Sequence, residues 1–599
     1  MPVPPGDQYH ARLVSRRATF ATLSRQDAWF STARLATFGL GAALLIAWWR
    51  GGLPAPWLVL PAAAFAVLIH RHDRVVRARS AAQRSIQFYE RGLARIEDRW
   101  AGTGEAGDRF RDDRHLYAND LDIFGRGSLF ELLSLARTRA GEETLAGWLT
   151  HPASPQEVAV RRDAVTELAP ALDLREGLAL AGSDVGASVD SSGLVTWAEG
   201  ETVLSGSWRW VAAAILTVGA IGATAYWLAT DEYAYLLAVL FLEAVFAIPQ
   251  RRSVQRALHS ADAPARDLDV LAHVLERLER ESFTTARLKE LRRRLDTEGI
   301  PASRAIGRLH WLVELHDWQH NLIFAPFAAA LLWDTHLAWA VERWRHVHGA
   351  HVRAWLRTVG EFEALGSFAA YRFEHPDDAW PEIVEGVAAF DGAALGHPLI
   401  PAAKMVRNDV RLNGSTRLLV VSGSNMSGKS TLLRTVGING VLALAGAPVR
   451  ATRLQMTPLA IGATLRIQDS LQEGRSRFYA EITRIRQLAD LARGTVPLLF
   501  LLDELFHGTN SHDRLVGASG VLGSLLDRGA IGLITTHDLA LTAIADRLSP
   551  RAANVHFEDH FDGGEIVFDF RMKPGPVTRS NALALMRSVG LDIGSDGTT

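Results

Sequence analysis

The chain has 599 residues, too many for a single hydrophobic core, so several domains are expected. Its 64 Lys and Arg residues against 66 Asp and Glu residues leave a net charge of −2, which excludes a global basic field that would attract nucleic acid. The sequence has no cysteine, which excludes disulfides, thiolate metal sites and cysteine nucleophiles.

Four apolar stretches, arranged as two pairs, account for a mean hydropathy of +0.04, which is high for a wholly soluble protein. The first pair covers residues 35–49 and 53–69, the second covers residues 210–229 and 233–249, and a polar tripeptide separates the members of each pair. A helix needs about 20 apolar residues to cross about 30 Å of hydrocarbon, so only residues 210–229 have the full length. Each pair nevertheless predicts a helical hairpin.

The residues around the two pairs favour a membrane. Arginines cluster on the outer flanks of both pairs, and tryptophans and tyrosines stand at the ends of the stretches. The positive-inside rule then places the outer flanks in the cytoplasm and the two short loops on the other side. The alternative is four buried core helices. Glu243, inside the fourth stretch, favours that alternative because an unpaired carboxylate within a membrane is costly.

The stretches between and after the hairpins show helical periodicity. Residues 129–152 repeat apolar residues at intervals of three and four, with a pause at Gly141. Residues 266–296 place apolar residues on one face and charges elsewhere, which is typical of a lever or bundle helix, or simply of a solvated helix face. Residues 322–333 predict a short core helix that ends at Asp334.

A glycine-rich loop follows the apolar residues 417–422, and a helical pattern follows the loop. Its spacing, Gly-x-x-x-x-Gly-Lys-Ser, is that of a P-loop, in which backbone N–H groups and a helix N-terminus cradle a polyphosphate. Lys429 is predicted to reach the terminal phosphates, and the Ser430 hydroxyl to bind Mg²⁺. The predicted nucleotide-binding residues are Gly423, Ser424, Asn425, Met426, Ser427, Gly428, Lys429, Ser430 and Thr431.

Two further apolar runs end in polar residues suited to ATP hydrolysis. Residues 496–510 contain a strand that ends in Asp503 and Glu504; the first carboxylate is expected to hold Mg²⁺ and the second to orient or deprotonate the attacking water. A strand over residues 530–538 ends in His537, where an imidazole could sense the γ-phosphate. A histidine after a strand is usually structural, but its place behind the other two motifs favours a functional role.

Residues 471–493 predict a Gly-Arg-Ser turn that leads into an amphipathic helix. Ser476 lies near the N-terminus of that helix, where unpaired N–H groups and the helix dipole favour anions. This helix end could bind a phosphate, which need not be the phosphate held by the P-loop of the same chain.

Five motifs resemble, in their order, those of the MutS family of ATPases, a branch of the ABC ATPase superfamily. The motifs are SGSNMSGKSTLLR, RIQDSLQEGRSRFYAEI, LLDELFHGTNSHDR, TTHDLAL and SNALALMRSVGL, and the similarity is close over about residues 400–591. Residues 127–169 resemble the start of the MutS core and lever region. The resemblance implies that Asn425 belongs to the nucleotide loop and that Ser476 acts on ATP bound by the opposite subunit. It also implies a dimer, with itself or with a hetero-partner of the same family, that encloses two nucleotides between two ATPase domains.

The rest of the chain departs from the family pattern. A polar segment and an apolar hairpin occupy the space before the core, so no amino-terminal mismatch-binding domain is expected. Arg477 stands where mismatch-repair members usually have threonine. The chain therefore resembles a divergent, membrane-inserted MutS homologue that lacks the mismatch-recognition domain.

The expected fold class is α and α/β multidomain: a carboxy-terminal P-loop ABC-type ATPase domain, a helical MutS-like core or lever domain, and two transmembrane helical hairpins. The expected segments are a cytoplasmic N-terminal segment (1–30), the first hairpin (31–72), a helical region that includes the start of the core (73–205), the second hairpin (206–252), a helical core or lever region (253–400) and the ATPase domain (401–599).

The expected function is hydrolysis of ATP with Mg²⁺ at a composite dimer interface, coupled to DNA binding of the mismatch-repair type and anchored in the membrane with the ATPase domain in the cytoplasm. The expected catalytic residues are Lys429, Ser476, Glu504 and His537, and the expected metal ligands are Ser430 and Asp503. The main alternative is a membrane-associated ATPase that acts on a protein or lipid partner without binding DNA. A scaffold that uses nucleotide only as a switch is disfavoured by the complete set of Lys429, Asp503 and Glu504.

Overall fold

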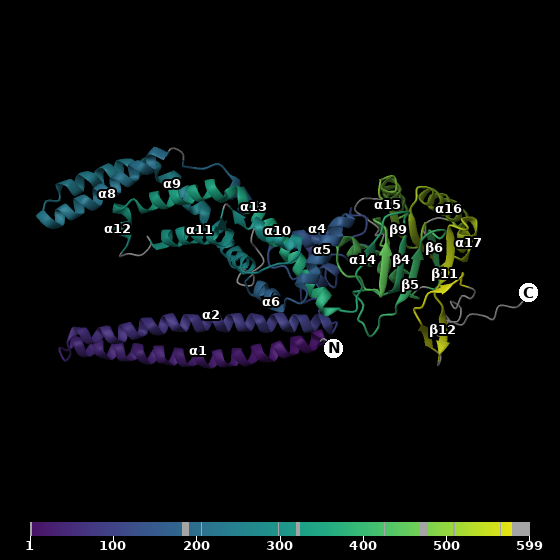
Figure 1. Ribbon diagram of the computed structural model, residues 1–599, viewed down its shortest axis with the longest axis horizontal. Coiled ribbons are helices and arrows are strands. Elements are labelled where there is room, and N and C mark those ends of the chain that lie inside the picture. Colours follow the sequence, from purple (N-terminus) through teal and green to yellow (C-terminus); the bar gives the residue numbers. More distant parts are fainter. Residues whose placement is uncertain are drawn as a thin grey trace, which may run out of the picture. The chain divides into compact units, whose positions relative to one another are not determined.

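The computed structural model describes residues 3–181, 191–204, 207–297, 299–318, 324–424, 426–466, 477–506, 510–562 and 565–577. The chain forms two compact units, each assembled from separate stretches (Figure 1). The first unit comprises Met1–Leu93, Leu135–Glu143 and Ala171–Ala364. The second comprises Ala94–Ser134, Thr144–Pro170 and Leu365–Thr599.

The first unit is helical. Its elements are α1 (Pro5–Trp49), the 3-10 turn η1 (Ala55–Leu58), α2 (Val59–Ile96), the first turn of α4 (Arg139–Thr150), α6 (Leu172–Ala181), α7 (Ser191–Glu199), α8 (Ser207–Thr230), α9 (Ala234–Glu279), α10 (Ala286–Arg294), α11 (Ala302–Asp317), α12 (Ala325–Ala330) and most of α13 (Trp333–Glu374). A minimal two-stranded sheet of β1 (Asp296–Thr297) and β2 (Ile300–Pro301) joins α10 to α11.

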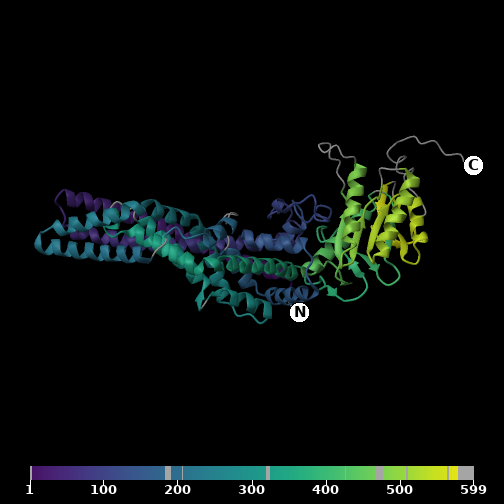
Figure 2. The ribbon, with the colours of Figure 1, turned by 90° about the horizontal axis from the view of Figure 1, so that it is seen from above.

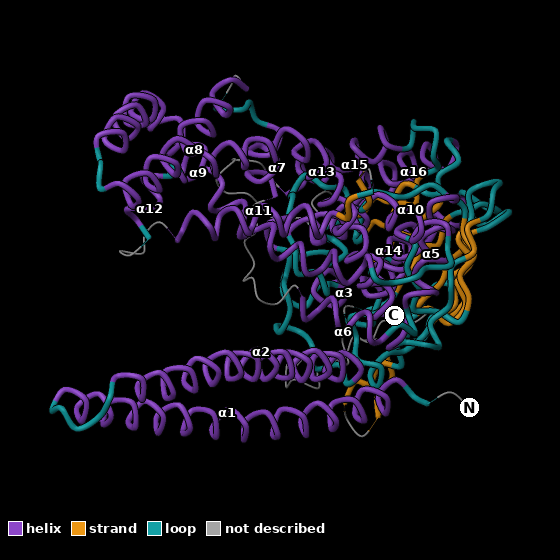
Figure 3. The backbone as a smooth tube through the Cα atoms, turned by 60° about the vertical axis from the view of Figure 1, so that its left-hand side comes forward, coloured by secondary structure: helices purple, strands orange, loops and turns teal. Residues whose placement is uncertain are grey.

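Both predicted hairpins are present as pairs of long helices. Figure 3 shows α1 and α2 running alongside each other as two helices joined by a loop. An ion-paired cluster links them, because the Asp27 carboxylate contacts His72 at 2.7 Å and Arg79 at 2.8 Å. The other ends of α1 and α2 attach to α6: the buried Glu176 carboxylate pairs with Arg16 at 2.8 Å and accepts the Tyr89 hydroxyl at 2.7 Å.

Three of the described helices are long and apolar enough to cross a membrane: Pro5–Trp49, Trp208–Thr230 and Ala234–Asp269. Their apolar side chains are largely exposed; Leu35 and Leu228, for example, are 73% and 75% exposed. Helix α2, which contains most of the predicted second stretch, does not meet the criterion. Only the first residues of α2 are apolar and charged residues follow from Arg71, so membrane crossing by the second stretch stays a prediction.

Other expected helices have different limits in the structure. The expected helix over residues 129–152 is two helices, α3 (Leu129–Leu133) and α4, and the expected helix over residues 266–296 is broken between α9 and α10. The expected end of a helix at Asp334 is wrong, because α13 begins at Trp333 and continues for 42 residues.

The second unit is an α/β domain with helical additions. Its helices are η2 (Asp108–Phe110), α3, the remainder of α4, α5 (Pro155–Leu168), α14 (Lys429–Ala445), α15 (Arg477–Leu491), α16 (Ser511–Asp527) and α17 (Leu539–Arg547). Its strands are β3 (Glu382–Ile383), β4 (Phe390–Leu395), β5 (Asn408–Leu412), β6 (Leu418–Ser422), β7 (Arg453–Met456), β8 (Ala460–Thr464), β9 (Leu498–Leu502), β10 (Ile531–Thr536), β11 (Ala552–His556), β12 (Asp559–Asp562), β13 (Glu565–Phe568) and β14 (Lys573–Pro574).

A six-stranded sheet is the centre of this unit, in the order β14-β11-β6-β10-β9-β8. The five strands from β11 to β8 are parallel, and only β14 is antiparallel. A second sheet has the order β3-β7-β4-β5, and β12 pairs with β13 as a separate hairpin. The strands of the six-stranded sheet stand between helices on both sides (Figure 2).

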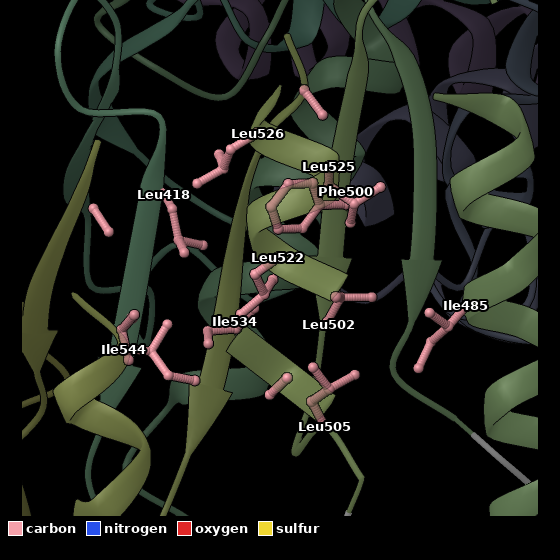
Figure 4. Packing of buried hydrophobic residues seen from close by; sticks show 14 of the residues in the cluster. Leu418, Ile485, Phe500, Leu502, Leu505, Leu522, Leu525, Leu526, Ile534 and Ile544 are labelled. Carbon is pink, nitrogen blue, oxygen red and sulfur yellow. The ribbon is translucent and has the colours of Figure 1, made fainter. Parts of the chain in front are cut away.

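Alternating side chains of the central strands pack on opposite faces of the six-stranded sheet, as the period of two in a strand requires. Phe500 and Leu502 on β9 join a buried apolar cluster with α15, α16 and α17 (Figure 4). Leu499 and Leu501 face the other side, where glycines of α14 allow a close approach. The parallel strands are buried on both faces, which explains why they are almost continuously apolar in the sequence.

Candidate functional site

The carboxyl ends of three neighbouring parallel strands carry the predicted site. The P-loop follows β6, Asp503 and Glu504 follow β9, and His537 follows β10. These strands are adjacent in the sheet, so their carboxyl ends meet at one edge, which is where open α/β sheets bind ligands. The strand expected before the P-loop and the strands expected to end at Asp503–Glu504 and at His537 are present as β6, β9 and β10.

The P-loop has the local structure that close contact with phosphates requires. Gly423 and Gly428 have φ values of +148° and +105°, and a Cβ on Gly423 would lie 2.8 Å from the carbonyl oxygen of Phe557. Gly428 directly precedes α14, so the helix N-terminus points its unpaired N–H groups at the loop. Ser427 closes the turn by donating to the Ser424 carbonyl at 2.8 Å.

Lys429 lies inside this loop. It is 5% exposed, and its ammonium group donates to the carbonyl oxygens of Gly423 at 2.8 Å and Ser424 at 2.6 Å. Burial lowers the pKa of Lys429, and the nearby charges of Glu504 and Asp503 oppose this shift. The Lys429 ammonium is buried and donates to loop carbonyls, so the negative charge of a bound polyphosphate would stabilise it further.

Asp503 connects the P-loop helix to the neighbouring strand β10. Its carboxylate accepts a hydrogen bond from the Ser430 hydroxyl at 2.7 Å and another from the Thr535 hydroxyl. The same Thr535 oxygen accepts the backbone N–H of Glu504 at 3.0 Å. A hydroxyl and a carboxylate in contact are the hard oxygen donors that Mg²⁺ prefers.

Glu504 and His537 form the second half of the site. Nδ1 of His537 lies 3.0 Å from a carboxylate oxygen of Glu504, and both side chains are about one-third exposed. Glu504 has a φ of +50°, a conformation that is uncommon for residues other than glycine and frequent at functional sites. The arrangement holds a carboxylate at the open side of the site, where it can contact a water molecule.

The residues present fit a nucleotide triphosphate with Mg²⁺. The Ser424 hydroxyl oxygen is buried and has no hydrogen-bond partner among the described residues, so the loop contains an unused polar group. The loop glycines leave room that a Cβ would fill, and Ser430 with Asp503 supplies the oxygen ligands.

Most of the predicted site residues are brought together, and a few are not. Lys429, Ser430, Asp503, Glu504 and His537 share one end of the sheet. Met426 is 84% exposed, and Thr431 lies exposed on the first turn of α14. Asn425 and Ser476 lie outside the described residues.

Two residues of the site were not predicted from the sequence. Thr535 has a signal that could have identified it, since it is a strand-end hydroxyl two residues before His537. Phe570 lies against the P-loop, because a Cβ on Gly428 would be 3.1 Å from its ring. Asn408 fixes this segment by donating to the Phe570 carbonyl at 3.0 Å and accepting the Met572 N–H at 2.8 Å. No local pattern marks Phe570, since its place depends on the β5 residue Asn408.

Comparisons with known proteins agree with this geometry. Residues 419–592 match the family model described as MutS domain V. The chain is 34% identical over 251 residues to the DNA mismatch repair protein MutS 2 of Halobacterium salinarum, and 31% identical over 246 residues to the DNA mismatch repair protein MutS of Geobacillus kaustophilus. It is 35% identical over 196 residues to the Endonuclease MutS2 of Thermus thermophilus.

These alignments cover 40%, 39% and 33% of this chain, but only 28%, 26% and 25% of the three relatives. The chain thus matches about a quarter of the length of the curated relatives. Residues 419–592 are therefore similar to MutS domain V, and the resemblance inferred from the motifs is confirmed for that part of the chain.

Proposed function

We propose that this protein is a Mg²⁺-dependent ATPase of the MutS type that binds DNA and is anchored in a membrane. The observation that carries the ATPase assignment is the position of Asp503, which contacts the hydroxyls of both Ser430 and Thr535 beside the Glu504–His537 pair. This arrangement joins the P-loop, a metal-binding carboxylate and a candidate general base at one end of the sheet.

Each residue has a role that follows from its position. Lys429 would exchange its two loop carbonyls for the terminal phosphates, and Ser430 with Asp503 would hold Mg²⁺, which neutralises charge on the phosphates. Glu504 would orient or deprotonate the attacking water. His537 would hold the Glu504 carboxylate and contact the γ-phosphate.

Hydrolysis would take place at an interface between two ATPase domains. The proposed second subunit is another copy of this chain or a hetero-partner of the same family, and Ser476 of one subunit would act on the ATP held by Lys429 of the other. The match to MutS domain V supports this arrangement, which provides a site that is complete only when two chains close on nucleotide.

DNA is the proposed ligand of the remaining part of the chain. The printed names of two relatives, DNA mismatch repair proteins, support it. The described residues 3–181 contain helices and 3-10 turns and no strand, which supports a role without a mixed α/β mismatch-recognition domain in that stretch.

The proposed membrane anchor consists of the two hairpins, α1 with α2 and α8 with α9, and leaves the ATPase domain in the cytoplasm. The exposed apolar side chains on α1, α8 and α9 support it, since a water-soluble protein rarely exposes contiguous apolar surface of this extent. The arginine-rich outer flanks of both hairpins agree with this orientation.

The test is the ATPase rate of detergent-purified protein, measured without DNA and with duplex, mismatched, branched or single-stranded DNA. Lys429→Ala serves as the blank. We expect a Mg²⁺-dependent rate that at least one DNA form changes, together with nucleotide-dependent binding of that form. A basal rate that is indifferent to all four forms would replace DNA with a protein or lipid partner. A wild-type rate no higher than that of the blank would refute the ATPase itself.

A further inference from the structure

A short apolar segment of the helical unit lies against the middle of α8. This segment, residues 325–332, consists of α12 and the two leucines that follow it, and it is named here the α12 segment. It contains no charged residue. The Leu331 carbonyl accepts a hydrogen bond from the Thr217 hydroxyl of α8 at 3.2 Å (Figure 1). Thr217 lies about 14 Å along the helix axis from Trp208, near the middle of the candidate membrane span Trp208–Thr230.

Apolar side chains on both sides of this contact are exposed. Ile215 and Val218, which flank Thr217 on α8, are 66% and 69% exposed, and Phe327 of the α12 segment is 61% exposed. In the proposed membrane anchor, the exposed side chains of α8 face lipid acyl chains. A segment that contacts α8 at the same depth then meets acyl chains as well.

The backbone between α12 and α13 is suited to a site without water. Helix α12 ends at Ala330 and α13 begins at Trp333, and Leu332 between them has a φ of +46°. The end of a helix leaves carbonyl groups without a helical donor, and hydrocarbon cannot replace that donor as water can. Thr217 supplies a donor from the neighbouring helix, which is how broken helices are tolerated within membranes.

Contacts of the adjacent helices lie on the side of the second hairpin that carries its basic flanks. Asp334, at the start of α13, lies 3.2 Å from His316 of α11. The His316 ring is 6.1 Å from the ring of His259, which belongs to the part of α9 beyond the basic flank. Further along α13, Glu342 accepts the backbone N–H of Val203 at 3.1 Å, before α8 begins. Helices α11 and α13 are therefore both held on the side that the positive-inside rule assigns to the cytoplasm.

We propose that the α12 segment inserts into the cytoplasmic half of the bilayer beside α8, with Phe327 among the lipid acyl chains, and that the Thr217 hydroxyl holds it there. Because α11 and α13 both lie on the cytoplasmic side, the segment adds no further crossing of the membrane. The inference rests on the proposed membrane anchor, and it adds a lipid-contacting surface that belongs to neither hairpin.

The first test uses single-cysteine variants of the full chain, which has no cysteine of its own. Each variant is purified in detergent, labelled with an NBD fluorophore and reconstituted into phosphatidylcholine vesicles that carry nitroxides on their acyl chains. Phe327→Cys probes the α12 segment, and Ile221→Cys is the reference on α8. Trp311→Cys on α11 is the matched control, since Trp311 and Ile221 are both 55% exposed and the neighbouring His310 lies 3.9 Å from Asp269, far along α9.

We expect the nitroxides to quench the labels at positions 327 and 221 at least about threefold more strongly than the label at position 311, because only groups in the hydrocarbon core approach the acyl chains. Quenching at position 221 without quenching at position 327 would overturn the inference and leave the membrane anchor in place. Quenching at neither position would refute the anchor and the inference with it. Equal quenching at all three positions would indicate adsorption of the whole unit onto the vesicle, which also overturns the inference.

The second test concerns the Thr217 hydroxyl. Thr217→Val removes the donor to the Leu331 carbonyl and keeps the shape of the side chain. We expect it to lower the quenching of the label in Phe327→Cys at least about twofold, without changing the quenching in Ile221→Cys. Thr224→Val is the matched control, since the Thr224 hydroxyl donates to the Ala220 carbonyl of its own helix at 2.7 Å.

Thr217→Ser, which keeps the hydroxyl, should give the wild-type quenching at position 327. This variant separates the loss of the hydrogen bond from a general loss of folding. If Thr217→Val and Thr224→Val behave alike in the Phe327→Cys background, Thr217 does not hold the α12 segment and its assigned role is refuted.

Discussion

Glu504 and His537 are in contact, and both are proposed to act in ATP hydrolysis. The His537 imidazole lies 3.0 Å from the Glu504 carboxylate, whereas the Asp503 carboxylate accepts the Ser430 hydroxyl of the P-loop helix at 2.7 Å. Removing the Glu504 charge should therefore affect water activation and leave the nucleotide and metal contacts in place. The two carboxylates are adjacent in sequence, but their contacts assign them different roles.

The variant Glu504→Gln tests this division. We expect hydrolysis to slow by about 10²- to 10⁴-fold, the range usual for loss of a general base, while ATP still binds. Single-turnover phosphate release gives the rate, and binding of a labelled nucleotide gives the affinity. Hydrolysis at the wild-type rate would show that another group activates the water.

His397 is a buried residue whose titration should appear in the stability of the protein. Burial lowers its pKa to about 4, with Arg434 as a second cause, whereas an unfolded histidine titrates near 6.5. The unfolded state then binds the proton more readily, so stability is full above about pH 6.5 and is lost as the pH falls toward 4. The difference amounts to at most about 3 kcal/mol.

The variant His397→Asn removes this titration and keeps an acceptor for the Leu399 N–H, which His397 Nδ1 accepts at 3.3 Å. We expect the free energy of unfolding of the wild-type protein to fall more than that of the variant between pH 7.5 and 4.5, by up to about 3 kcal/mol. Denaturant unfolding at the two pH values measures this difference. Equal losses in both proteins would contradict the assigned pKa shift.

Helix α14 packs closely against Leu121 and strand β9. Gly437 lies at the point of closest contact, where a Cβ would come within 2.6 Å of Leu121 and 2.7 Å of Leu501, both fully buried. Alanine at this position would favour the helix by about 1 kcal/mol, but the overlap with two packed leucines costs more.

We therefore expect Gly437→Ala to destabilise the protein by about 1 to 3 kcal/mol. Gly440→Ala is the matched control on the same helix, because its Cβ would lie 3.2 Å from one Ile461 methyl group, and we expect its stability to stay within about 1 kcal/mol of the wild type. Denaturant unfolding compares the three proteins. A Gly437→Ala variant more stable than Gly440→Ala would contradict the packing argument.

The central strands could be predicted from the sequence because burial on both faces produces continuous apolar runs that end in polar residues. The helix limits could not be predicted as well. The fourth apolar stretch was expected to end at Pro249, but α9 continues through both Pro249 and Pro264. Residues 129–152 have a helical period throughout, yet the chain leaves the helix at Ser134, since contacts with distant residues such as Glu363 set the conformation of Arg137 and Thr138.

The site could be predicted where its residues follow one another along the chain. Lys429, Ser430, Asp503 and Glu504 have fixed spacing from a glycine or a strand end, so local patterns identify them. The ion pair of Asp120 with Arg484 in the same unit joins residues 364 positions apart, and no local pattern encodes a contact made by tertiary packing. The same is true of Phe570, whose place depends on Asn408.

The chain combines a match to MutS domain V with exposed apolar hairpins. The family match covers residues 419–592, and the hairpins lie in other parts of the chain. The hairpins therefore need their own test, independent of ATP and DNA. The absence of cysteine in the sequence provides one, because any introduced thiol is the sole target of a maleimide.

Three single-cysteine variants test the topology in cells. Ala55→Cys lies in the exposed turn of the first hairpin, Glu232→Cys lies in the exposed loop of the second, and Lys404→Cys lies on the surface of the ATPase-containing unit. If both hairpins cross the membrane, a membrane-impermeant maleimide should label the first two in intact cells and the third only after lysis. Because apolar residues 35–49 extend over only about 22 Å of helix, the first hairpin is the more stringent case. Labelling of Glu232→Cys alone would confine the first hairpin to the cytoplasmic leaflet, and labelling of all three only after lysis would refute a membrane-spanning anchor.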